Sequence, residues 1–421
     1  MNKWHEALEI IFSNLQPIEA AKMPIDDALS LVASEDALSP ENLPAFDNSA
    51  MDGFAVRFSD CAGATEDSPV SLRVLEDLPA GRVAAQAVSA GAALRIMTGA
   101  VIPMGCDVVV PVEDTRPATD ADEYVYILRT PKLKGNIRAA GEDIVAGQTV
   151  ISEGQQVSAA HIGLMAALGI SELLVIPPVK AAVITTGSEL ADVLEKPVAG
   201  KIRDANIHSL SAQIRSWGAV PIAFPRIADT RQAVESALEE AASLCDLLIT
   251  TGGVSVGDYD YVKEVLNALG AKQHFWRVAQ KPGGPFGFWT LWGKPFFGIP
   301  GNPVSAIVMA ELYLKPAIYR MMGRKNVNYQ RVAARLESGF RKTGADGKRH
   351  FLRVIADERE GKWTARLSGP QGSAQLASMR AANALAMIPE DTLEVPAGGE
   401  VELLLIKTNR ASTYQWPNSP P

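Results

Sequence analysis

Five short loops in the middle of the chain, each after a segment typical of a β-strand, carry Gly, Pro, Asp or Lys where a helix would begin. They are TTGSEL (185–190), ADT (228–230), TTGGVSVGDYDY (250–261), KPGG (281–284) and GIPGNPVSA (298–306). In an open parallel sheet such loops emerge along one edge, so residues distant in sequence converge on a single crevice. The sequence therefore predicts that the functional site lies at this edge.

The segments around these loops alternate between strand-like and helix-like patterns. The predicted strands are 179–185, 220–226, 246–250 and 295–299, with extended segments through 275–291, and the predicted helices are 206–217, 230–243, 259–269 and 302–321. This alternation is typical of a mainly parallel sheet covered by helices on both faces. We therefore expect a three-layer α/β domain over residues 178–326.

The rest of the chain predicts three further domains, because 421 residues exceed what one hydrophobic core usually covers. Short β-type runs at 47–138 predict an inserted β-rich domain. The flanking segments 1–46 and 139–177 carry helical patterns at 3–15 and 154–170, which we expect to pack together in one discontinuous linking domain. Alternating β runs at 327–410 predict a C-terminal β-barrel, followed by a disordered tail at 411–421.

Composition excludes several classes of function. The net charge of -8 and the pI near 5.3 argue against a nucleic-acid or membrane-surface partner, because both are polyanions. No run of about 18 apolar residues predicts a membrane span. Cys61, Cys106 and Cys245 lie far apart, which indicates neither a disulfide framework nor a thiolate zinc site and fits a reducing cytoplasm. The histidines show no metal-binding spacing.

TTGGVSVGDYDY is the most informative single loop. Gly252, Gly253 and Gly257 would let the backbone approach a ligand and turn its amides toward an anion, with the next helix adding its positive end. Phosphate binding is the natural inference, although the spacing matches neither the Walker motif nor GxGxxG. A tight glycine turn capped by Asp258 is the structural alternative.

Four acidic residues on these loops, Glu189, Asp229, Asp258 and Asp260, would repel an anionic ligand unless a cation lay between them. Magnesium would resolve this conflict, because a hard cation accepts carboxylate and phosphate oxygens together. Helix N-capping is the alternative for each residue taken singly.

The KPGG and GIPGNPVSA loops supply further candidate anion ligands. Lys281 could reach a bound oxyanion, although a loop lysine is often merely solvated. Asn302 and Ser305 open a helix whose start could hold an anion, and ordinary N-capping explains Asn302 equally well.

The β-rich region contributes three polar segments: AFDNSAMDGFAVR (45–57), RIMTGAVIP (95–103) and NIRAAGEDI (136–144). They could reach a substrate held by another domain or subunit, with Arg138 gripping phosphate. The structural alternatives are turns at Asp47 and Asn48, a hairpin at Gly99, and a surface role for Arg138.

Taken in order, DNSAMDGFAVR, IMTGAVIP, NIRAAGEDI, TTGSEL, TTGGVSVGDYDY, KPGG and GIPGNPVSA resemble the molybdopterin molybdenumtransferase family, which includes bacterial MoeA and the E domain of gephyrin. The resemblance spans residues 5 to 408, and seven motifs in order are far more specific than any one. It implies a homodimer of four-domain subunits that moves molybdenum from molybdate into adenylylated molybdopterin, with magnesium, and releases AMP. The pathway's molybdopterin adenylyltransferase is an implied partner.

The resemblance also implies roles for individual residues. Asp52, Thr98, Asp229 and Asp260 would be catalytic, with Asp52 and Thr98 coming from the partner subunit. Glu189, Asp229 and Asp260 would also serve the metal and the pyrophosphate. The implied cofactor-binding residues are Arg138, Thr186, Gly187, Gly252, Gly253, Ser255, Lys281, Pro300, Asn302, Pro303, Ser305 and Ser373. Both reactants are anions, so charge compensation and positioning would do most of the work. The attacking group would be molybdate oxygen or water derived from it.

Three positions qualify the resemblance. Gly284 stands where many members carry a second lysine, in KPGK. GKRHFLR offers Lys348, with Arg349 beside it, where the family places an arginine. SGPQGSAQLASM makes Ser373 a candidate oxyanion ligand, with simple turn formation as the alternative.

Two other functions fit parts of the sequence. TTGGVSVGDYDY also resembles the stand-alone molybdopterin adenylyltransferase, but that relative is essentially the α/β domain alone. A non-catalytic molybdopterin-binding scaffold is the other alternative, although no proline-rich or charged linker marks an additional module.

Overall fold

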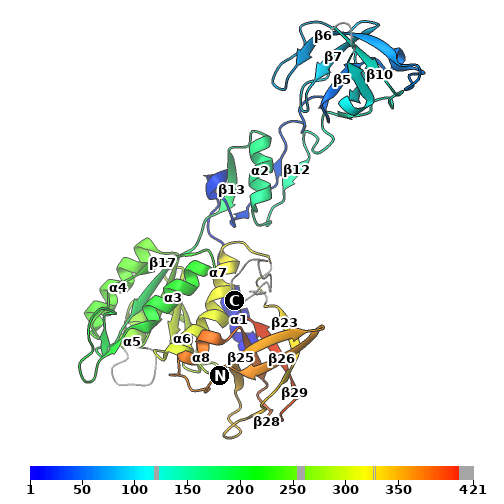
Figure 1. Ribbon diagram of the computed structural model, residues 1–421. Helices are drawn as coiled ribbons and strands as arrows, with labels where there is room; N and C mark the ends of the chain where they lie inside the picture. The colour runs from blue at the N-terminus through cyan, green and yellow to red at the C-terminus, as the bar shows by residue number, and fades with distance from the viewer. Residues whose placement is uncertain (118–122, 254–260, 326, 328, 407–421) are drawn as a thin grey trace. The chain divides into compact units, whose positions relative to one another are not determined.

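The computed structural model describes residues 1–117, 123–253, 261–325, 327 and 329–406. The chain forms two compact units (Figure 1). The larger unit contains residues 1–21, 30–34 and 175 onward, and the smaller contains residues 22–29 and 35–174. Strands β1 (Ala21–Pro24) and β13 (Glu172–Ile176) each run from one unit into the other.

A six-stranded sheet forms the centre of the larger unit. Its strands, in order across the sheet, are β17 (Val220–Ala223), β14 (Lys180–Thr185), β18 (Leu247–Thr251), β22 (Lys294–Ile299), β21 (Gly287–Leu291) and β19 (Lys272–Trp276). The first four strands pair in parallel, and the last two are antiparallel. The predicted mainly parallel sheet is confirmed, and the loops after β14, β17, β18 and β22 leave from the same edge.

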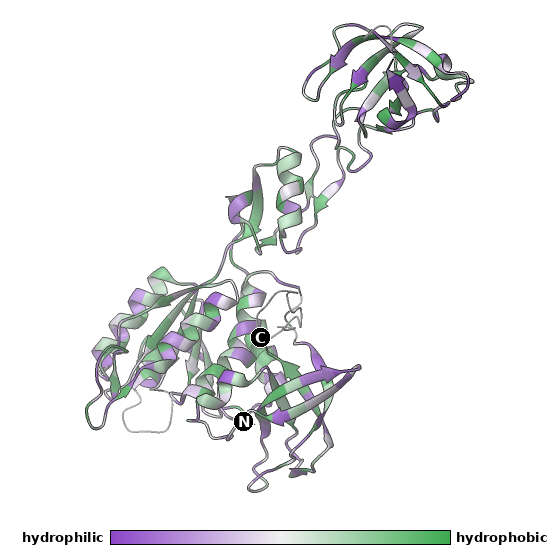
Figure 2. Ribbon diagram, in the orientation of Figure 1, coloured by the Kyte–Doolittle hydropathy of each residue, from purple (hydrophilic) through white to green (hydrophobic). Residues whose placement is uncertain are grey.

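Helices cover both faces of this sheet. Helices α4 (Arg231–Leu244) and α5 (Tyr261–Ala268) bury Val234, Leu238 and Val265 against Ala182 and Leu248. Helix α3 (Ala205–Ser216) packs on β14 and β17, and it also contacts α6 (Pro303–Met309). Apolar residues accordingly concentrate in the strands, while the helices are mixed (Figure 2). The three-layer prediction is confirmed.

The predicted helix 302–321 is continuous but not uniformly α-helical. Between α6 and α7 (Lys315–Met321) lies a π-helical turn, η4 (Ala310–Leu314), whose five residues are all buried. Tyr313 of η4 stacks on Phe286, with ring centroids 4.5 Å apart. Turns of this kind are rare and often occur at functional sites.

The C-terminal region closes into the predicted barrel. Strands β25 (Arg349–Arg359), β26 (Lys362–Leu367), β23 (Arg331–Leu336), β29 (Gly399–Leu405) and β27 (Ala384–Ile388) follow one another, and β27 pairs back to β25. Leu352, Val354, Ile388 and Leu403 belong to its core. The short elements β24 (Phe340–Arg341), β28 (Glu394–Val395) and α8 (Ala377–Ala381) lie in its connections.

The KPGG loop differs from our expectation. It follows β20 (Gln280–Lys281), which does not belong to the parallel sheet but pairs with β25 of the barrel, placing Lys281 beside His350. The loop therefore owes its position to the barrel. Sequence periodicity could not reveal this pairing, because a two-residue strand has no measurable period.

The N-terminal helix also packs differently from our expectation. Helix α1 (Trp4–Ser13) was expected to pack with the helix near residue 160, but it lies within the larger unit. Trp4 meets Phe351 of the barrel edge to face, with ring centroids 5.5 Å apart, and α1 contacts α7. In the same unit β2 (Val32–Ala33) pairs with the end of β13.

The smaller unit is built on a second six-stranded sheet. Its order is β8 (Val108–Pro111), β5 (Gly53–Val56), β7 (Ala92–Ile96), β6 (Val70–Leu78), β10 (Tyr124–Ile127) and β9 (Thr115–Pro117). Alternate residues of β5 and β7 enter two different cores, so both faces are covered: Val56 and Ala93 lie in one, Ala55 and Leu94 in the other. The predicted β-rich character is confirmed.

Shorter elements complete the smaller unit. Helix α2 (Ala159–Ala167) begins at the predicted N-cap, where the Ser158 hydroxyl accepts a hydrogen bond from the His161 amide at 3.3 Å. The remaining elements are η1 (Ile25–Asp27), β3 (Ala37–Leu38), β4 (Asn48–Ser49), η2 (Phe58–Cys61), η3 (Val112–Asp114), β11 (Ile137–Arg138) and β12 (Thr149–Ile151). The four-domain boundaries stay a prediction, and the tail at 411–421 lies outside the described residues. No helix among the described residues is long and apolar enough to cross a bilayer.

The two glycines of KPGG provide a matched test of the loop's conformation. Gly283 has φ +93°, and a Cβ there would lie 2.1 Å from the Met309 Sδ, whereas a Cβ on Gly284 would meet nothing closer than 3.4 Å. We expect Gly283→Ala to lower the free energy of unfolding by roughly 1–3 kcal/mol and Gly284→Ala to change it by less than about 0.5 kcal/mol. Chemical denaturation measures both, and equal effects would contradict this account.

Candidate functional site

A cavity of about 790 Å³ opens at the carboxyl edge of the parallel sheet. Residues from four of the loops that follow strands line it, together with residues from two segments of the barrel. A cavity of this size suits a small molecule with several polar groups. The predicted convergence is therefore present for four of the five loops, whereas the ADT loop (228–230) does not line the cavity.

Main-chain hydrogen bonds join neighbouring loops at the floor of the cavity. The Thr186 amide donates to the Thr251 carbonyl (3.2 Å), and the Gly252 amide donates to the Ile299 carbonyl (3.2 Å). A Cβ on Gly252 would lie 2.6 Å from the Thr186 carbonyl oxygen, so only glycine permits this approach. The Gly252 amide is thus used between loops, which differs from the anion-binding role that we expected for it.

Asn206, at the start of α3, ties two of these loops together. Its side-chain amide donates to the Thr251 hydroxyl (2.7 Å) and to the Gly301 carbonyl (2.8 Å). Asp204 caps the helix by accepting from the Asn206 amide (3.0 Å). Both residues line the cavity, and sequence reasoning missed them, although the Asp at the start of a helical pattern was a usable signal.

The KPGG loop is held from behind by buried side chains. Gln280, which is 1% exposed, donates to the Pro282 carbonyl (3.1 Å) and accepts from the Tyr313 hydroxyl (2.6 Å). The Lys281 side chain is exposed at the cavity. The π-helical turn therefore supports the loop that carries this cation.

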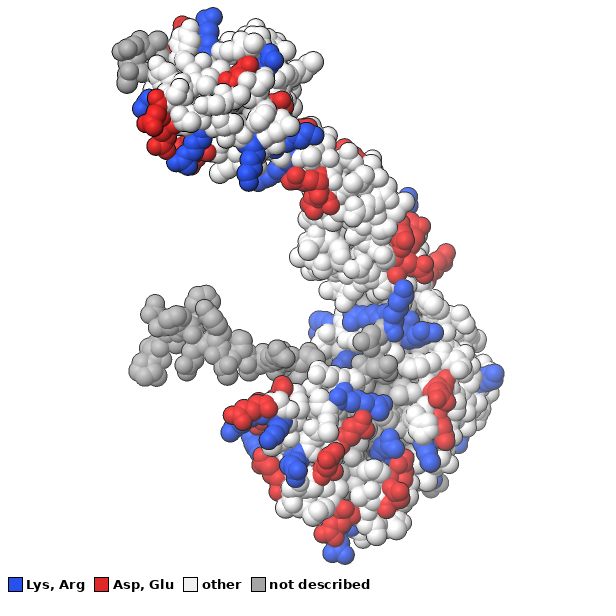
Figure 3. Space-filling model, turned by 90° about the vertical axis from the view of Figure 1, so that its right-hand side faces the viewer, with Lys and Arg blue, Asp and Glu red and all other residues white. Residues whose placement is uncertain are grey.

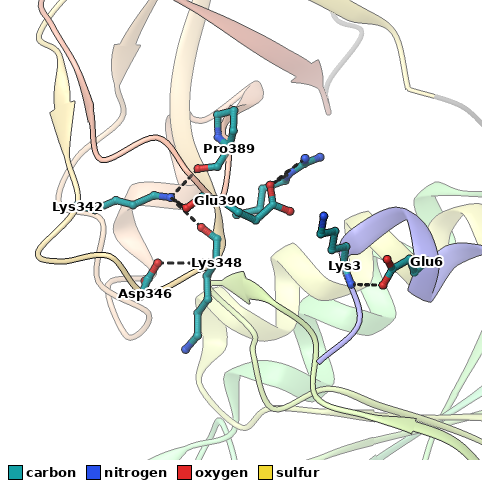
Figure 4. Close-up of polar contacts among 8 residues, drawn as sticks. Lys3, Glu6, Lys342, Asp346, Lys348, Pro389 and Glu390 are labelled. Carbon is teal, nitrogen blue, oxygen red and sulfur yellow. Dashed lines mark hydrogen bonds and ion pairs between the residues drawn. The ribbon is translucent and has the colours of Figure 1, made fainter.

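A second lysine at the cavity, besides Lys281, is Lys348 of the barrel, and not its neighbour Arg349. Lys348 lines the cavity, whereas Arg349 pairs with the Glu390 carboxylate at 3.1 Å. Figure 4 shows the Lys348 side chain running away from its main-chain contacts. Of the two candidates that the sequence left open, the structure places Lys348 at the site.

A buried lysine anchors the segment that carries Lys348. The Lys342 ammonium, in a residue 5% exposed, donates to the carbonyls of Pro389 (2.6 Å), Lys348 (2.9 Å) and Glu390 (3.1 Å) (Figure 4). Desolvation lowers the pKa of Lys342, while nearby carboxylates oppose this shift. Asp346 fixes the same turn by accepting from the Lys348 amide (3.1 Å) and from the His350 ring (2.8 Å).

Ser373 lies on a barrel loop that contacts the start of α6. Its carbonyl accepts from the Val304 amide at 3.2 Å, while Ser373 itself lines the cavity. Pro303 has no amide hydrogen, so the first two helical positions offer no free donor to an anion. The Val304 amide therefore holds the loop, and the anion site expected at this helix start stays a prediction that rests on Ser305.

The structure brings most of the predicted binding residues together. Those that line the cavity are Thr186, Glu189, Gly252, Gly253, Lys281, Pro300, Asn302, Pro303, Ser305 and Ser373. Gly187 lies behind Glu189, because a Cβ on it would come within 2.8 Å of the Glu189 carboxylate. Ser255, Asp258 and Asp260 lie outside the described residues, and their roles stay predictions.

Two capping alternatives from the sequence do not hold. The Asn302 side chain makes no capping hydrogen bond. Helix α4 is capped by Thr230, and Asp229 instead accepts from the Ser188 amide at 2.6 Å. Asp229 therefore joins the ADT and TTGSEL loops.

The magnesium prediction meets an incomplete donor set. Among the described residues no group of three acidic, histidine or cysteine side chains could hold a metal ion. Glu189 lines the cavity, Asp229 is engaged with Ser188, and Asp260 lies outside the described part. Magnesium usually takes only one or two carboxylates together with substrate phosphates, so Glu189 suits such an ion without defining a site.

The smaller unit has a second cluster of predicted residues. The Asp52 carboxylate accepts from the amide and the hydroxyl of Thr98, both at 2.7 Å, and these hydrogen bonds lower the pKa of Asp52. Arg138 is exposed and pairs with Asn48 across strands β11 and β4. Asn48 also bridges to Val101. Three motifs distant in sequence therefore meet on this unit.

The structural roles in this cluster differ in part from those expected: β7 pairs with β5 and β6 and not with β8, so Gly99 lies in a turn and not in a hairpin, and Asn48 lies in strand β4. Gly99 has φ +83° in a turn closed by a hydrogen bond from the Ala100 amide to the Met97 carbonyl (3.0 Å). Asp47 accepts from the Ala140 amide at 2.7 Å. These residues shape the loops that present Asp52, Thr98 and Arg138.

Charge on the visible surface is mixed in sign. Figure 3 shows Lys and Arg interspersed with Asp and Glu on the face of each unit that it displays. That face carries no broad basic surface of the kind that a nucleic-acid backbone requires.

Family models match three consecutive regions of the chain. The model described as MoeA N-terminal region (domain I and II) matches residues 2–169. The probable molybdopterin binding domain matches residues 182–320, and the MoeA C-terminal region (domain IV) matches residues 334–406.

Relatives match over nearly the whole chain. Molybdopterin molybdenumtransferase 2 of Mycobacterium tuberculosis is 38% identical over 96% of this chain and 99% of its own. Molybdopterin molybdenumtransferase of Bacillus subtilis is 33% identical over 94% and 92%. Among solved structures, a molybdopterin biosynthesis MoeA protein of Pyrococcus horikoshii superimposes with a TM-score of 0.82 at 29% identity, covering 96% of this chain and 99% of that one.

The buried Lys342, which binds the Lys348 carbonyl, provides a test of how the barrel segment at the cavity is held. We expect Lys342→Met to lower the free energy of unfolding by roughly 1–3 kcal/mol, because three carbonyls lose a buried donor. Arg341→Met is the matched control. The Arg341 side chain is 78% exposed and its ion pair with Glu394 is long, at 3.7 Å, so we expect the free energy of unfolding to change by less than about 0.5 kcal/mol. Denaturation curves that do not separate the two variants would refute the anchoring role of Lys342.

Proposed function

The chain belongs to the molybdopterin molybdenumtransferase family, and on that premise we propose that it inserts molybdenum from molybdate into adenylylated molybdopterin with release of AMP. It is a transferase of molybdenum cofactor biosynthesis. The observation that carries the proposal is one cavity of about 790 Å³ into which Thr186, Gly252, Lys281, Asn302 and Ser373 converge from five separate segments.

Charge compensation is the main task of this cavity, because molybdate and the adenylylated pterin are both anions. Lys281 and Lys348 approach from two different segments, and ammonium groups can follow an oxyanion as it moves. The hydroxyls of Ser305 and Ser373 can donate to oxygen atoms without adding charge. Preorganised donors of this kind stabilise developing charge without reorganising during the reaction.

Magnesium remains part of the proposal with a limited role. Glu189 would hold it from the cavity wall, together with phosphate oxygens and the predicted ligands Asp229 and Asp260. When bound, such an ion neutralises charge on the pyrophosphate. The Glu189 carboxylate lies so close to Gly187 that a Cβ there would come within 2.8 Å of it, so any larger residue at position 187 would displace this ligand.

We propose a homodimer in which Asp52, Thr98 and Arg138 of one subunit complete the cavity of the other. Exposed apolar side chains support a protein partner near the cavity: Leu194 is 91% exposed and Val198 is 69% exposed, on the connection between β15 (Leu190–Ala191) and β16 (Ile202–Arg203), whose ends Leu190 and Ile202 line the cavity. Exposed apolar groups of this kind favour an interface. The molybdopterin adenylyltransferase of the pathway is a second proposed partner, and the cytoplasm is the proposed location.

Turnover with defined substrates tests the proposed function. Purified protein incubated with adenylylated molybdopterin, molybdate and magnesium should release AMP and retain molybdenum. We expect Lys281→Met to reduce the rate at least about tenfold, because one charge-assisted contact is lost. Lys294→Met is the control, since Lys294 donates to the Ala242 and Cys245 carbonyls and lies outside the cavity lining. Pterin binding without turnover would favour the non-catalytic scaffold function. Attachment of AMP to molybdopterin would favour the adenylyltransferase function.

Mixed dimers test whether the site is shared. Asp52→Ala and Asp260→Asn proteins should each be inactive, and after subunit exchange the mixture should recover about a quarter of wild-type AMP release, since a heterodimer keeps one intact site. Exchange is followed with differently tagged subunits. Proven exchange without recovery would count against a shared site.

A further inference from the structure

The loop that carries Ser373 is shaped by a single buried guanidinium. Arg353 lies on β25 and is 1% exposed. Its Nη2 donates to the carbonyls of Pro370 (2.9 Å) and Gly372 (3.0 Å), and its Nη1 donates to the carbonyl of Gln371 (3.0 Å). Three consecutive carbonyls therefore turn toward one side chain, and Ser373 is the next residue in the chain.

The remaining polar atoms of Arg353 bind the same region. Its Nε donates to the Ser378 hydroxyl at 3.1 Å, at the start of α8. Its main-chain amide donates to the Gln371 side-chain oxygen (2.9 Å), and its carbonyl accepts from the Gln371 side-chain nitrogen (3.1 Å). The loop is thus fixed to β25 by both the backbone and the side chain of Arg353.

No acidic residue in the described part of the chain forms an ion pair with Arg353. Burial lowers its pKa to about 10, so the group still carries its charge near neutral pH. A buried cation satisfied only by neutral carbonyl and hydroxyl oxygens is a costly way to stabilise a fold, and an apolar side chain of similar volume often serves as well. An apolar residue, however, cannot replace a planar guanidinium that orients three carbonyls at once.

The loop is attached at its other end to the α/β domain. The Ser373 carbonyl accepts from the Val304 amide at 3.2 Å, so the loop spans from the barrel to α6. Ser373 and Ala374 line the cavity. Arg353, Gln371 and Gly372 line a neighbouring hollow of about 250 Å³ that also borders on Lys281. Arg353 thus stands directly behind the wall that presents Ser373.

We propose that Arg353 is a positioning residue that sets the Ser373 hydroxyl for the tetrahedral oxyanion substrate. It acts through the carbonyls of residues 370–372 and does not contact the substrate. This inference rests on the proposed function, because it takes molybdate as the oxyanion. It assigns affinity for the oxyanion to a residue outside the cavity lining.

Equilibrium dialysis of the full chain with molybdate alone, in the absence of the pterin, tests this role. We expect Arg353→Met to weaken molybdate binding about tenfold, the effect of losing one hydrogen bond to a charged group. Arg353→Lys keeps the charge but lacks the planar guanidinium, and we expect a similar loss. Arg359→Met is the matched control on the same strand, because that side chain is exposed at the end of β25; it should bind molybdate like the wild type.

A double-mutant cycle separates positioning from a merely structural role. If Arg353 acts through Ser373, the Arg353→Met/Ser373→Ala protein should bind molybdate no more weakly than Ser373→Ala alone. The Kd for adenylylated molybdopterin should change less than about twofold in each variant. Arg353→Lys keeps the test usable if Arg353→Met does not fold.

The outcomes distinguish this inference from the proposed function. Wild-type affinity in both Arg353 variants, or additive losses with Ser373→Ala, would overturn the positioning role while AMP release by the wild type could still stand. Wild-type protein that binds molybdate but releases no AMP would overturn the insertase proposal, and the cycle would still decide the role of Arg353. Wild-type protein that binds no molybdate would overturn both.

Discussion

The hydrogen bonds between loops at the carboxyl edge of the sheet are the constraint on which the rest of the site depends. Thr186, Thr251, Gly252 and Ile299 bind one another through the backbone, and Asn206 adds side-chain contacts to two of the loops. Because these polar groups bind one another, the backbone at these positions is fixed before any ligand arrives. Preorganisation of this kind reduces the ordering that binding would otherwise require.

The barrel and its paired strand β20 contribute two kinds of cation, buried ones and ones at the cavity. Lys342 and Arg353 are buried and donate hydrogen bonds to main-chain carbonyls, so they hold the backbone in place. Lys281 and Lys348 line the cavity. The cavity lining contains three basic residues, Arg203, Lys281 and Lys348, and three acidic ones, Glu189, Asp204 and Asp346, so it offers anions individual cations at fixed places although the protein has a net charge of -8. The charges close to the cavity decide whether it can bind an anion, because surface charges beyond a Debye length of about 10 Å are screened.

The sequence predicted the fold closely where local pattern decides it. The helix 230–243 and the strand 179–185 appear within one residue of their observed bounds, and Ser158 caps α2 as expected. Side-chain partnerships were harder to foresee. Asp229 and Asn302 do not cap their helices, and nothing in the pattern distinguished Arg353 from a surface arginine of a strand.

The sequence by itself determined which segments become strands, helices and turns, and which residue types stand at the strand ends. Periodicity, glycine and proline act over a few residues, so they can be read without knowing the fold. Only the tertiary structure decided which of those residues meet. The pairing of Lys281 with His350, the choice of Lys348 over Arg349, and the attachment of Ser373 to α6 each join segments far apart in the chain. Such contacts depend on packing of whole elements, which no local pattern encodes.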